Sequence, residues 1–152
     1  LNMLPDPFDG LFISMNFTTT DGTSSLDVDN GTVTFPFRKL SEDVSNISIG
    51  YDKNKFDVRL SYVSRSPYLD YLADDDSETI QEDLDNNNIR YTDDHTQIDF
   101  NLKYKINDNV SVKFDINNIT DEPEFYYWGT QNRLSQYDEY ETTYSIGIRY
   151  NL

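Results

Sequence analysis

Apolar residues recur at every second position in six segments of the chain. A period of two is typical of a β-strand that turns one face to an apolar environment and the other to water. No helical periodicity of comparable length is present, so the sequence predicts an all-β fold of about six long antiparallel strands. The alternating residues are Ile13, Met15 and Phe17; Ile47, Ile49 and Tyr51; Phe56, Val58, Leu60 and Tyr62; Ile98, Phe100, Leu102 and Tyr104; Val110, Val112, Phe114 and Ile116; and Tyr144, Ile146, Ile148, Tyr150 and Leu152.

The connections between these segments are alternately short and long. DKNK (52–55) and INDN (106–109) are tight turns rich in Asn and Asp. Three other links, at about 20–45, 66–97 and 119–141, are much longer than most loops of compact domains. Short turns at one end of the strands and long loops at the other are the layout of a transmembrane β-barrel. We therefore expect an antiparallel meander that is part of such a barrel.

Charge is sorted between these two ends. The long links hold 21 of the 28 acidic residues and 4 of the 12 basic ones, a balance of −17, which leaves +1 for the strands and short turns. Polar residues, some with negative and some with positive charge, alternate with the apolar ones, as in Asp57, Arg59 and Ser61. A face of this kind suits a water-filled lumen. An antiparallel soluble sheet with one solvent-exposed face gives the same alternation. Such a sheet does not, however, explain why the negative charge is concentrated in the long links.

Several classes of function are disfavoured by composition. A net charge of −16 argues against nucleic acid as a partner, because phosphate recognition needs clustered Lys and Arg. The chain has no cysteine and a single histidine, His95. The sequence therefore disfavours a catalytic proton relay built on histidine residues. No Gly-rich phosphate loop and no nucleophile with a neighbouring base is present. We expect no enzymatic activity.

Four stretches carry a resemblance to a known family. LPDPFDGLFISMNFTTTDG, FDVRLSYVSRSPYL, FDINNITDEPEFYY and YSIGIRYNL resemble consecutive strands and turns in the C-terminal part of TonB-dependent outer-membrane receptors. In the third stretch, the family's Asn-Leu-Thr/Asp-Asp ending is here Asn118, Ile119, Thr120 and Asp121. The order and spacing of the four stretches agree with the family. Residues 1–152 are therefore identified as C-terminal barrel strands, with no plug domain among them.

The resemblance implies a ligand-gated importer of a scarce nutrient in the bacterial outer membrane, with the long loops outside the cell. Its partners would be the remaining barrel strands and plug, outer-membrane lipid and the outer-membrane assembly machinery. The closing strand that this machinery reads corresponds to Tyr144, Ile146, Ile148, Tyr150 and Leu152. The family's last residue is usually Phe, whereas here it is Leu152.

Two clusters are candidate binding sites. Carboxylates at Asp74, Asp75, Asp76 and Glu78 offer oxygen ligands of the kind that Ca²⁺ takes, although the spacing is not that of an EF-hand loop. Charge runs of this kind are usually solvated, and we expect no other cofactor. The stretch 70–88 has almost no apolar residue to anchor it, so we expect it to be mobile. The aromatic run Phe125, Tyr126, Tyr127 and Trp128 is a candidate surface for stacking a sugar, or else caps the barrel rim.

Two other interpretations stay open at the level of sequence. The chain alone would be an open six-stranded sheet whose exposed strand edges pair between copies, giving a homo-oligomeric ring or an extracellular filament. A small soluble β-barrel binding protein would need about eight strands to close around a ligand, and TVTFPF (32–37) is the only further short strand in view.

Overall fold

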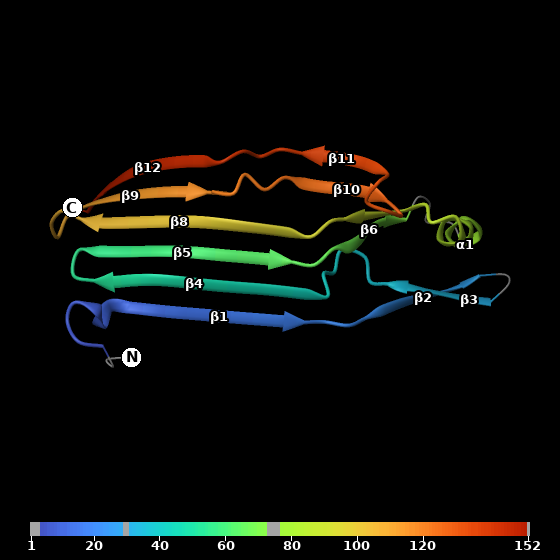
Figure 1. Cartoon of the computed structure of the whole chain (residues 1–152), viewed down its shortest axis with the longest axis horizontal. Coiled ribbons are helices and arrows are strands. Elements are labelled where there is room, and N and C mark those ends of the chain that lie inside the picture. Colours follow the sequence, from blue (N-terminus) through green and yellow to red (C-terminus); the bar gives the residue numbers. More distant parts are fainter. Residues whose placement is uncertain (1–3, 29–30, 73–76, 152) are drawn as a thin grey trace.

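The computed structural model describes residues 4–28, 31–72 and 77–151, and their long strands form one antiparallel sheet (Figure 1). The six strands lie in the order β1, β4, β5, β8, β9 and β12, so each pairs with the preceding long strand of the meander. The predicted all-β meander is confirmed. The sheet is open, with β1 and β12 at its two edges. The strands are β1 (Leu11–Thr19), β4 (Asp43–Lys53), β5 (Phe56–Arg65), β8 (His95–Lys105), β9 (Val110–Asn117) and β12 (Thr143–Tyr150).

The register places the alternating apolar residues on one side of the sheet. Ile49 lies opposite Ile13 on one neighbouring strand and opposite Leu60 on the other. The row continues from Leu60 to Phe100 and from Phe100 to Ile116. A shift of one residue would turn a whole strand over, so this row fixes one continuous apolar face, and the polar residues of the same strands form the opposite, polar face.

No protein core covers the apolar face in the part of the chain that the structure describes. Ile146 and Ile148 of β12 are 78% and 77% exposed, and Ile13 of β1 is 64% exposed. Soluble proteins rarely leave an apolar surface of this extent uncovered. The long sheet therefore differs from an ordinary soluble sheet, whose apolar side packs against a second layer.

Both short turns lie at the same end of the sheet, here named the turn end. In the first turn, Asn54 adopts the left-handed backbone conformation (φ 56°), which Asn tolerates better than most residues. In the second, the side-chain Oδ1 of Asn107 accepts hydrogen bonds from the backbone N–H groups of Asn109 and Val110. The N-terminal described residues, with the 3-10 helix η1 (Phe8–Gly10), and the C-terminal end of the chain also lie at the turn end (Figure 1).

The opposite end, here named the loop end, carries more regular structure than the sequence predicts. A four-stranded sheet in the order β11, β10, β7, β6 continues β12, β9, β8 and β5 in the same order, and β2 and β3 form a separate antiparallel ribbon. The long links at 20–45, 66–97 and 119–141 therefore contain short strands rather than irregular loops. These strands are β2 (Thr23–Val28), β3 (Gly31–Pro36), β6 (Tyr68–Leu72), β7 (Ile89–Thr92), β10 (Glu124–Trp128) and β11 (Leu134–Asp138).

A small hydrophobic core also lies at the loop end. Helix α1 (Ser77–Asp85) buries Ile80, which is 3% exposed, and Leu84 packs against the same cluster. The strands supply the remaining buried apolar residues of this core, Val33, Leu69, Leu72 and Ile89. The expectation that the stretch 70–88 lacks an anchor is wrong for its described part, because two apolar residues four positions apart are enough to seat one face of a short helix.

Strand β9 ends at a compact turn that begins with Asn118. This residue has a left-handed backbone (φ 54°) and is 6% exposed. Its side-chain Oδ1 accepts from the N–H of Glu122 and its Nδ2 donates to the carbonyl of Glu122, while its own N–H donates to Asp99 Oδ1. Thr142 Oγ1 donates to the Asn118 carbonyl at 2.8 Å. The turn thereby ties β8, β9 and the entry to β12 together.

Candidate functional site

A hydrogen-bonded network runs across the polar face of the long sheet. Asp115 of β9 is only 9% exposed, and its carboxylate is held from three directions. Asn101 Nδ2 donates to Oδ1 at 2.8 Å, Ser145 Oγ donates to Oδ2 at 3.2 Å, and Lys113 Nζ lies 2.9 Å from Oδ2. A buried carboxylate needs such partners in place of water, so the network fixes the polar side of β8, β9 and β12.

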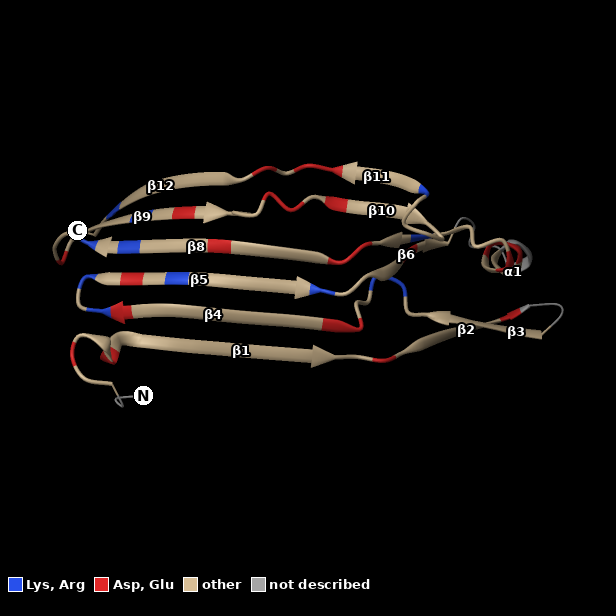
Figure 2. Ribbon diagram, in the orientation of Figure 1, with Lys and Arg blue, Asp and Glu red and all other residues tan. Residues whose placement is uncertain are grey.

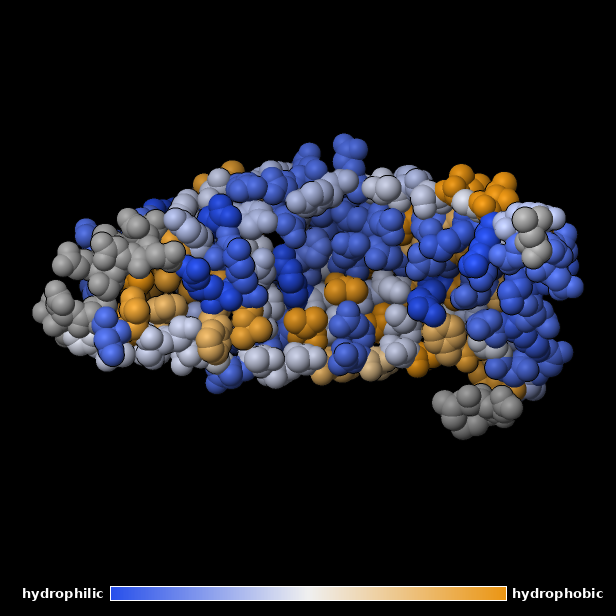
Figure 3. Space-filling model, turned by 180° about the vertical axis from the view of Figure 1, so that it is seen from behind, coloured by the Kyte–Doolittle hydropathy of each residue, from blue (hydrophilic) through white to orange (hydrophobic). Residues whose placement is uncertain are grey.

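The polar face remains hydrogen-bonded towards the loop end. Gln97 Nε2 donates to Asp99 Oδ1 at 2.8 Å, and the hydroxyls of Ser48 and Ser61 lie 3.2 Å apart on neighbouring strands. Figure 3 shows one face of the molecule, over most of which hydrophilic side chains predominate. Such a face suits contact with water or with polar protein surface on the inside of a barrel.

The two ends of the molecule differ in charge. Lys103, Lys105 and Arg149 line a hollow at the turn end together with the residues of the second short turn. Acidic residues predominate in the links and in helix α1 at the loop end (Figure 2). The negative charge is therefore concentrated at the loop end, whereas the strands and short turns together are close to neutral.

A charged and aromatic cluster lies on the four-stranded sheet at the loop end. Arg90 of β7 donates from Nε to Asp70 Oδ2 at 2.7 Å, and a second guanidinium nitrogen lies 2.5 Å from the same oxygen. Its guanidinium also lies over the ring of Tyr126, 4.9 Å from the centroid. Asp70 is 8% exposed. The partly buried ion pair with Asp70 and the stacking on Tyr126 together hold Arg90 in one orientation.

The cluster continues to the polar face of the long sheet through Glu124. Tyr126 donates its hydroxyl to Glu124 Oε2 at 2.7 Å, and Arg65 lies 3.6 Å from Glu124 Oε1 and over the ring of Tyr68. The hydrogen bond to Glu124, aided by burial, raises the pKa of Tyr126 well above its ordinary value. Tyr126 therefore stays a neutral donor.

Sequence reasoning missed this cluster. Arg90 and Asp70 are 20 residues apart, and Tyr126 joins them only because β10 pairs with β7. The sequence did contain one signal for it. The long links hold only four basic residues among many acidic ones, so each basic residue is a candidate partner for a carboxylate. These residues are Arg38, Lys39, Arg90 and Arg133.

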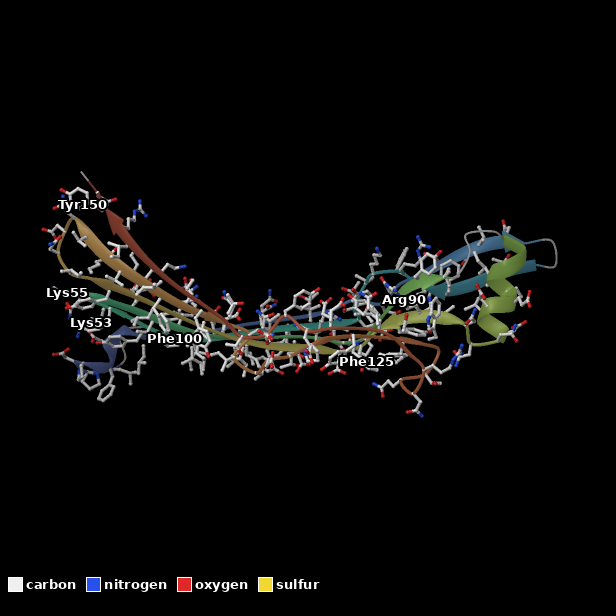
Figure 4. The ribbon with its side chains drawn as sticks, turned by 90° about the horizontal axis from the view of Figure 1, so that it is seen from above. Lys53, Lys55, Arg90, Phe100, Phe125 and Tyr150 are labelled. Atoms are coloured by element: carbon white, nitrogen blue, oxygen red, sulfur yellow. The ribbon has the colours of Figure 1, made fainter. Side chains whose placement is uncertain are left out.

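The aromatic run at 125–128 forms strand β10, and the strand divides it between two faces. Phe125 and Tyr127 lie on one side, where Tyr127 stacks on Tyr91 with centroids 5.5 Å apart and Phe125 meets Tyr137 edge-on at 6.4 Å. Tyr126 lies on the other side with Arg90, and alternation places Trp128 there too. Figure 4 shows Phe125 and Arg90 pointing to opposite sides of the sheet. The four rings therefore do not form one stacking surface.

The predicted metal ligands lie largely beyond what the structure shows. Asp74, Asp75 and Asp76 are outside the described residues, and Glu78 belongs to α1 but its side chain is not described. Within the described ranges, no group of three His, Asp or Glu side chains converges in a way that would hold a metal ion. Calcium binding stays a prediction.

The predicted closing-strand residues form one exposed row on β12. Tyr144 lies opposite Ile116, Ile146 opposite Phe114, and Ile148 opposite Val112. Tyr150 ends the strand opposite Val110, and Leu152 lies outside the described residues. The row belongs to the apolar face. Its recognition by the outer-membrane assembly machinery stays a prediction.

The long strands have the dimensions of membrane-spanning strands. They contain 8 to 11 residues, and about 9–11 residues suffice for a tilted strand to cross the hydrocarbon layer. An uncovered apolar face, a hydrogen-bonded polar face, and short turns and long loops at opposite ends define a segment of an outer-membrane type β-barrel. No helix among the described residues has the length and apolar character needed to cross a bilayer.

The chain belongs to the TonB dependent receptor-like, beta-barrel family, whose model matches residues 4–119. The match covers the long strands from β1 to β9 and ends before β10, β11 and β12. A search of curated proteins and a search of solved structures each found no match. The family consists of outer-membrane transporters and receptors, not enzymes, so it implies a bacterial outer-membrane setting, together with the rest of a receptor barrel and its plug.

Proposed function

We propose that this chain forms part of the wall of an outer-membrane transporter that imports a scarce nutrient, with the loop end outside the cell. The apolar face of the long sheet carries the proposal. Its rows of aliphatic and aromatic residues, tyrosines included, run without interruption from β1 to β12, and the hydrophobic core of the described residues lies elsewhere, at the loop end. Hydrocarbon lipid is the environment in which such a face is stable.

The strand edges support the same proposal. β1 and β12 each have one unpaired side, and no unpaired backbone edge is tolerated within the hydrocarbon layer. Further strands of the same barrel would satisfy both edges while leaving the apolar face in lipid. Pairing between copies in a ring or filament would satisfy the edges but leave the apolar face in water, so the barrel accounts for more of the structure.

Import is testable without knowing the ligand. Cells that produce the protein and cells that lack its gene are grown in the same nutrient-limited medium, and the medium is compared by untargeted mass spectrometry. We expect at least one compound to be depleted only by the producing cells, and we expect a protonophore to abolish that depletion because the family couples import to the energised inner membrane. A depletion profile that is identical in the two strains would contradict the proposal.

A further inference from the structure

A hollow on the polar face lies over the turn-end halves of β5, β8 and β9. Its volume is about 240 Å³, and three of its six lining residues are cations. All six belong to these three strands and to the described ranges, so the hollow is built by the barrel wall itself. The lining consists of Asp57, Arg59, Asn101, Leu102, Lys103 and Lys113.

Arg59 brings an oriented but unengaged guanidinium to this hollow. The group lies over the ring of Phe12, 5.4 Å from the centroid, and that ring in turn packs on Gly50. In the part of the chain that the structure describes, no hydrogen bond or ion pair engages the guanidinium. Its five N–H donors lie in one plane. Because the ring already restrains this plane, little freedom is lost when an acceptor binds.

Lys103 adds a second cation that has no partner. It is a diagonal neighbour of Arg59 in the pairing of β5 with β8, so both side chains can reach one acceptor. On β9 it lies opposite Lys113, and like charges in direct opposition repel. Lys113 is paired with Asp115 at 2.9 Å. The ammonium of Lys103, by contrast, makes no hydrogen bond or ion pair with any described residue, not even with Asp57 opposite it on β5.

The environment of the polar face decides what these two groups need. The family implies a plug domain together with the barrel, and the polar face is the side that lines the lumen. Water satisfies cations on an open surface. Protein that covers them has to supply an acceptor, because an uncompensated buried charge is strongly destabilising. The planar fork of an arginine matches a carboxylate, which it binds with two parallel hydrogen bonds.

We propose that Arg59 and Lys103 together receive one carboxylate, from an Asp or Glu side chain of the plug domain seated in the barrel lumen. Arg59 donates the two parallel hydrogen bonds and Lys103 adds a point charge. Asp57 in the same lining repels a second anion. This inference rests on the proposed function, because it requires that the polar face lines the lumen, and it names the contact that holds the plug against this part of the wall.

The test is zero-length crosslinking of the complete receptor, purified from outer membranes in detergent. A water-soluble carbodiimide joins a lysine amine to a carboxylate only where the two are in contact, and mass spectrometry of the digest identifies the joined residues. Lys53 is the positive control, because its ammonium lies 2.5 Å from Asp9 at the same end. The variants are Arg59→Gln, Arg59→Lys and, as a matched control, Arg149→Gln. Arg149 is a turn-end cation outside this hollow, and it already donates to Asn151.

We expect Lys103 to be joined to an Asp or Glu of the plug. Arg59→Gln should lower the yield of this product about fivefold, because the carboxylate loses its oriented partner, and Arg149→Gln should leave it within about twofold. In Arg59→Lys, which keeps the positive charge, the amine at position 59 should itself be joined to the same plug residue. This gain of a product does not depend on the stability of the neutral variant.

The proposal is overturned if Lys53 is joined to Asp9 while Lys103 yields no product, or is joined only to Asp57 or to another carboxylate of the barrel wall. Occupation of the hollow by a free anion would give that same absence of a product. Equal yields in Arg59→Gln and Arg149→Gln would overturn the shared role of Arg59. The depletion experiment is independent of these outcomes. A receptor that imports without the crosslink contradicts this inference alone, and a receptor that forms the crosslink without importing contradicts only the transport.

Discussion

The ring of Phe12 occupies the space above Gly50 on the adjacent strand. The two residues are direct partners in the antiparallel pairing of β1 with β4. A Cβ atom added to residue 50 would lie 2.3 Å from Cζ of Phe12 and 2.6 Å from the carbonyl oxygen of Val58. Arg59, the cross-strand neighbour of Gly50 on its other side, lies over the same ring at 5.4 Å. The absence of a side chain at position 50 therefore allows an aromatic ring to lie flat on the polar face.

Gly50→Ala should destabilise the barrel by about 1–3 kcal/mol, because the new methyl group meets backbone as well as ring and neither can move away freely. Gly147 of β12 provides the control, since a Cβ there meets no atom within 4 Å. Gly147→Ala should be neutral or slightly stabilising, because Gly lowers strand stability. Urea unfolding in lipid vesicles measures both variants. Equal costs at the two positions would show that the contact between Phe12 and residue 50 is unimportant.

The assignment of faces can be tested at two consecutive residues of β5. Leu60 belongs to the apolar row, and Ser61 lies on the polar face opposite Asp99 of β8. Leu60→Arg places a charge in hydrocarbon and should cost about 2–4 kcal/mol near the middle of the bilayer. Ser61→Arg places the same charge at the same depth beside a carboxylate and should cost much less. The comparison uses unfolding in lipid, and similar losses for both variants would argue against the inside and outside assignment.

The long sheet could be predicted because its signals are local. Six alternating runs such as Phe56 to Tyr62 define the strands, and the polar tetrapeptides 52–55 and 106–109 define the turns. Register then follows from matching one apolar row to the next. The prediction of one continuous apolar face therefore needed no contact between distant parts of the chain other than the pairing of successive strands.

Helix α1 should depend on Ile80, its most deeply buried described side chain. Ile80→Ala removes this side chain from the small core and leaves only Leu84 to pack against it, and such truncations cost about 2–5 kcal/mol. Glu82→Ala on the exposed side should stay within about 0.5 kcal/mol. Hydrogen exchange of the backbone amides of residues 80–85 reports the difference. If Ile80→Ala and Glu82→Ala exchange alike, the helix has no anchor in the core.

The hydrogen bond between Tyr126 and Glu124 should set the ionisation of this tyrosine. In the folded protein its pKa lies above the ordinary value of 10.0, chiefly because the hydroxyl donates to Glu124. The associated stabilisation is therefore fully present below about pH 10 and is lost as the pH rises through the folded-state pKa. Glu124→Gln keeps an acceptor but removes the charge, so the Tyr126 pKa should fall towards its ordinary value. Tyrosine Cζ chemical shifts in a selectively ¹³C-labelled sample follow the titration, and an unchanged pKa in the variant would contradict this assignment.

The loop end was harder to predict because its order comes from distant pairing. Strand β7 has four residues and β6 and β10 have five, which is too short for alternation to stand out from polar sequence. Helix α1 shows only Ile80 and Leu84 on its apolar side. Arg90, Asp70 and Tyr126 carry no shared local motif, and their meeting depends on the pairing of three separate strands.

The orientation in the membrane tests the account most directly, and the absence of cysteine from the chain makes it accessible. Asn132→Cys places a thiol at the loop end, between β10 and β11, and Asp108→Cys places one in a short turn at the turn end. Each variant is treated on intact cells with a membrane-impermeant maleimide. The account predicts rapid labelling of the cysteine at 132, and labelling at 108 only after the outer membrane is permeabilised. Labelling of 108 on intact cells with 132 protected would contradict it.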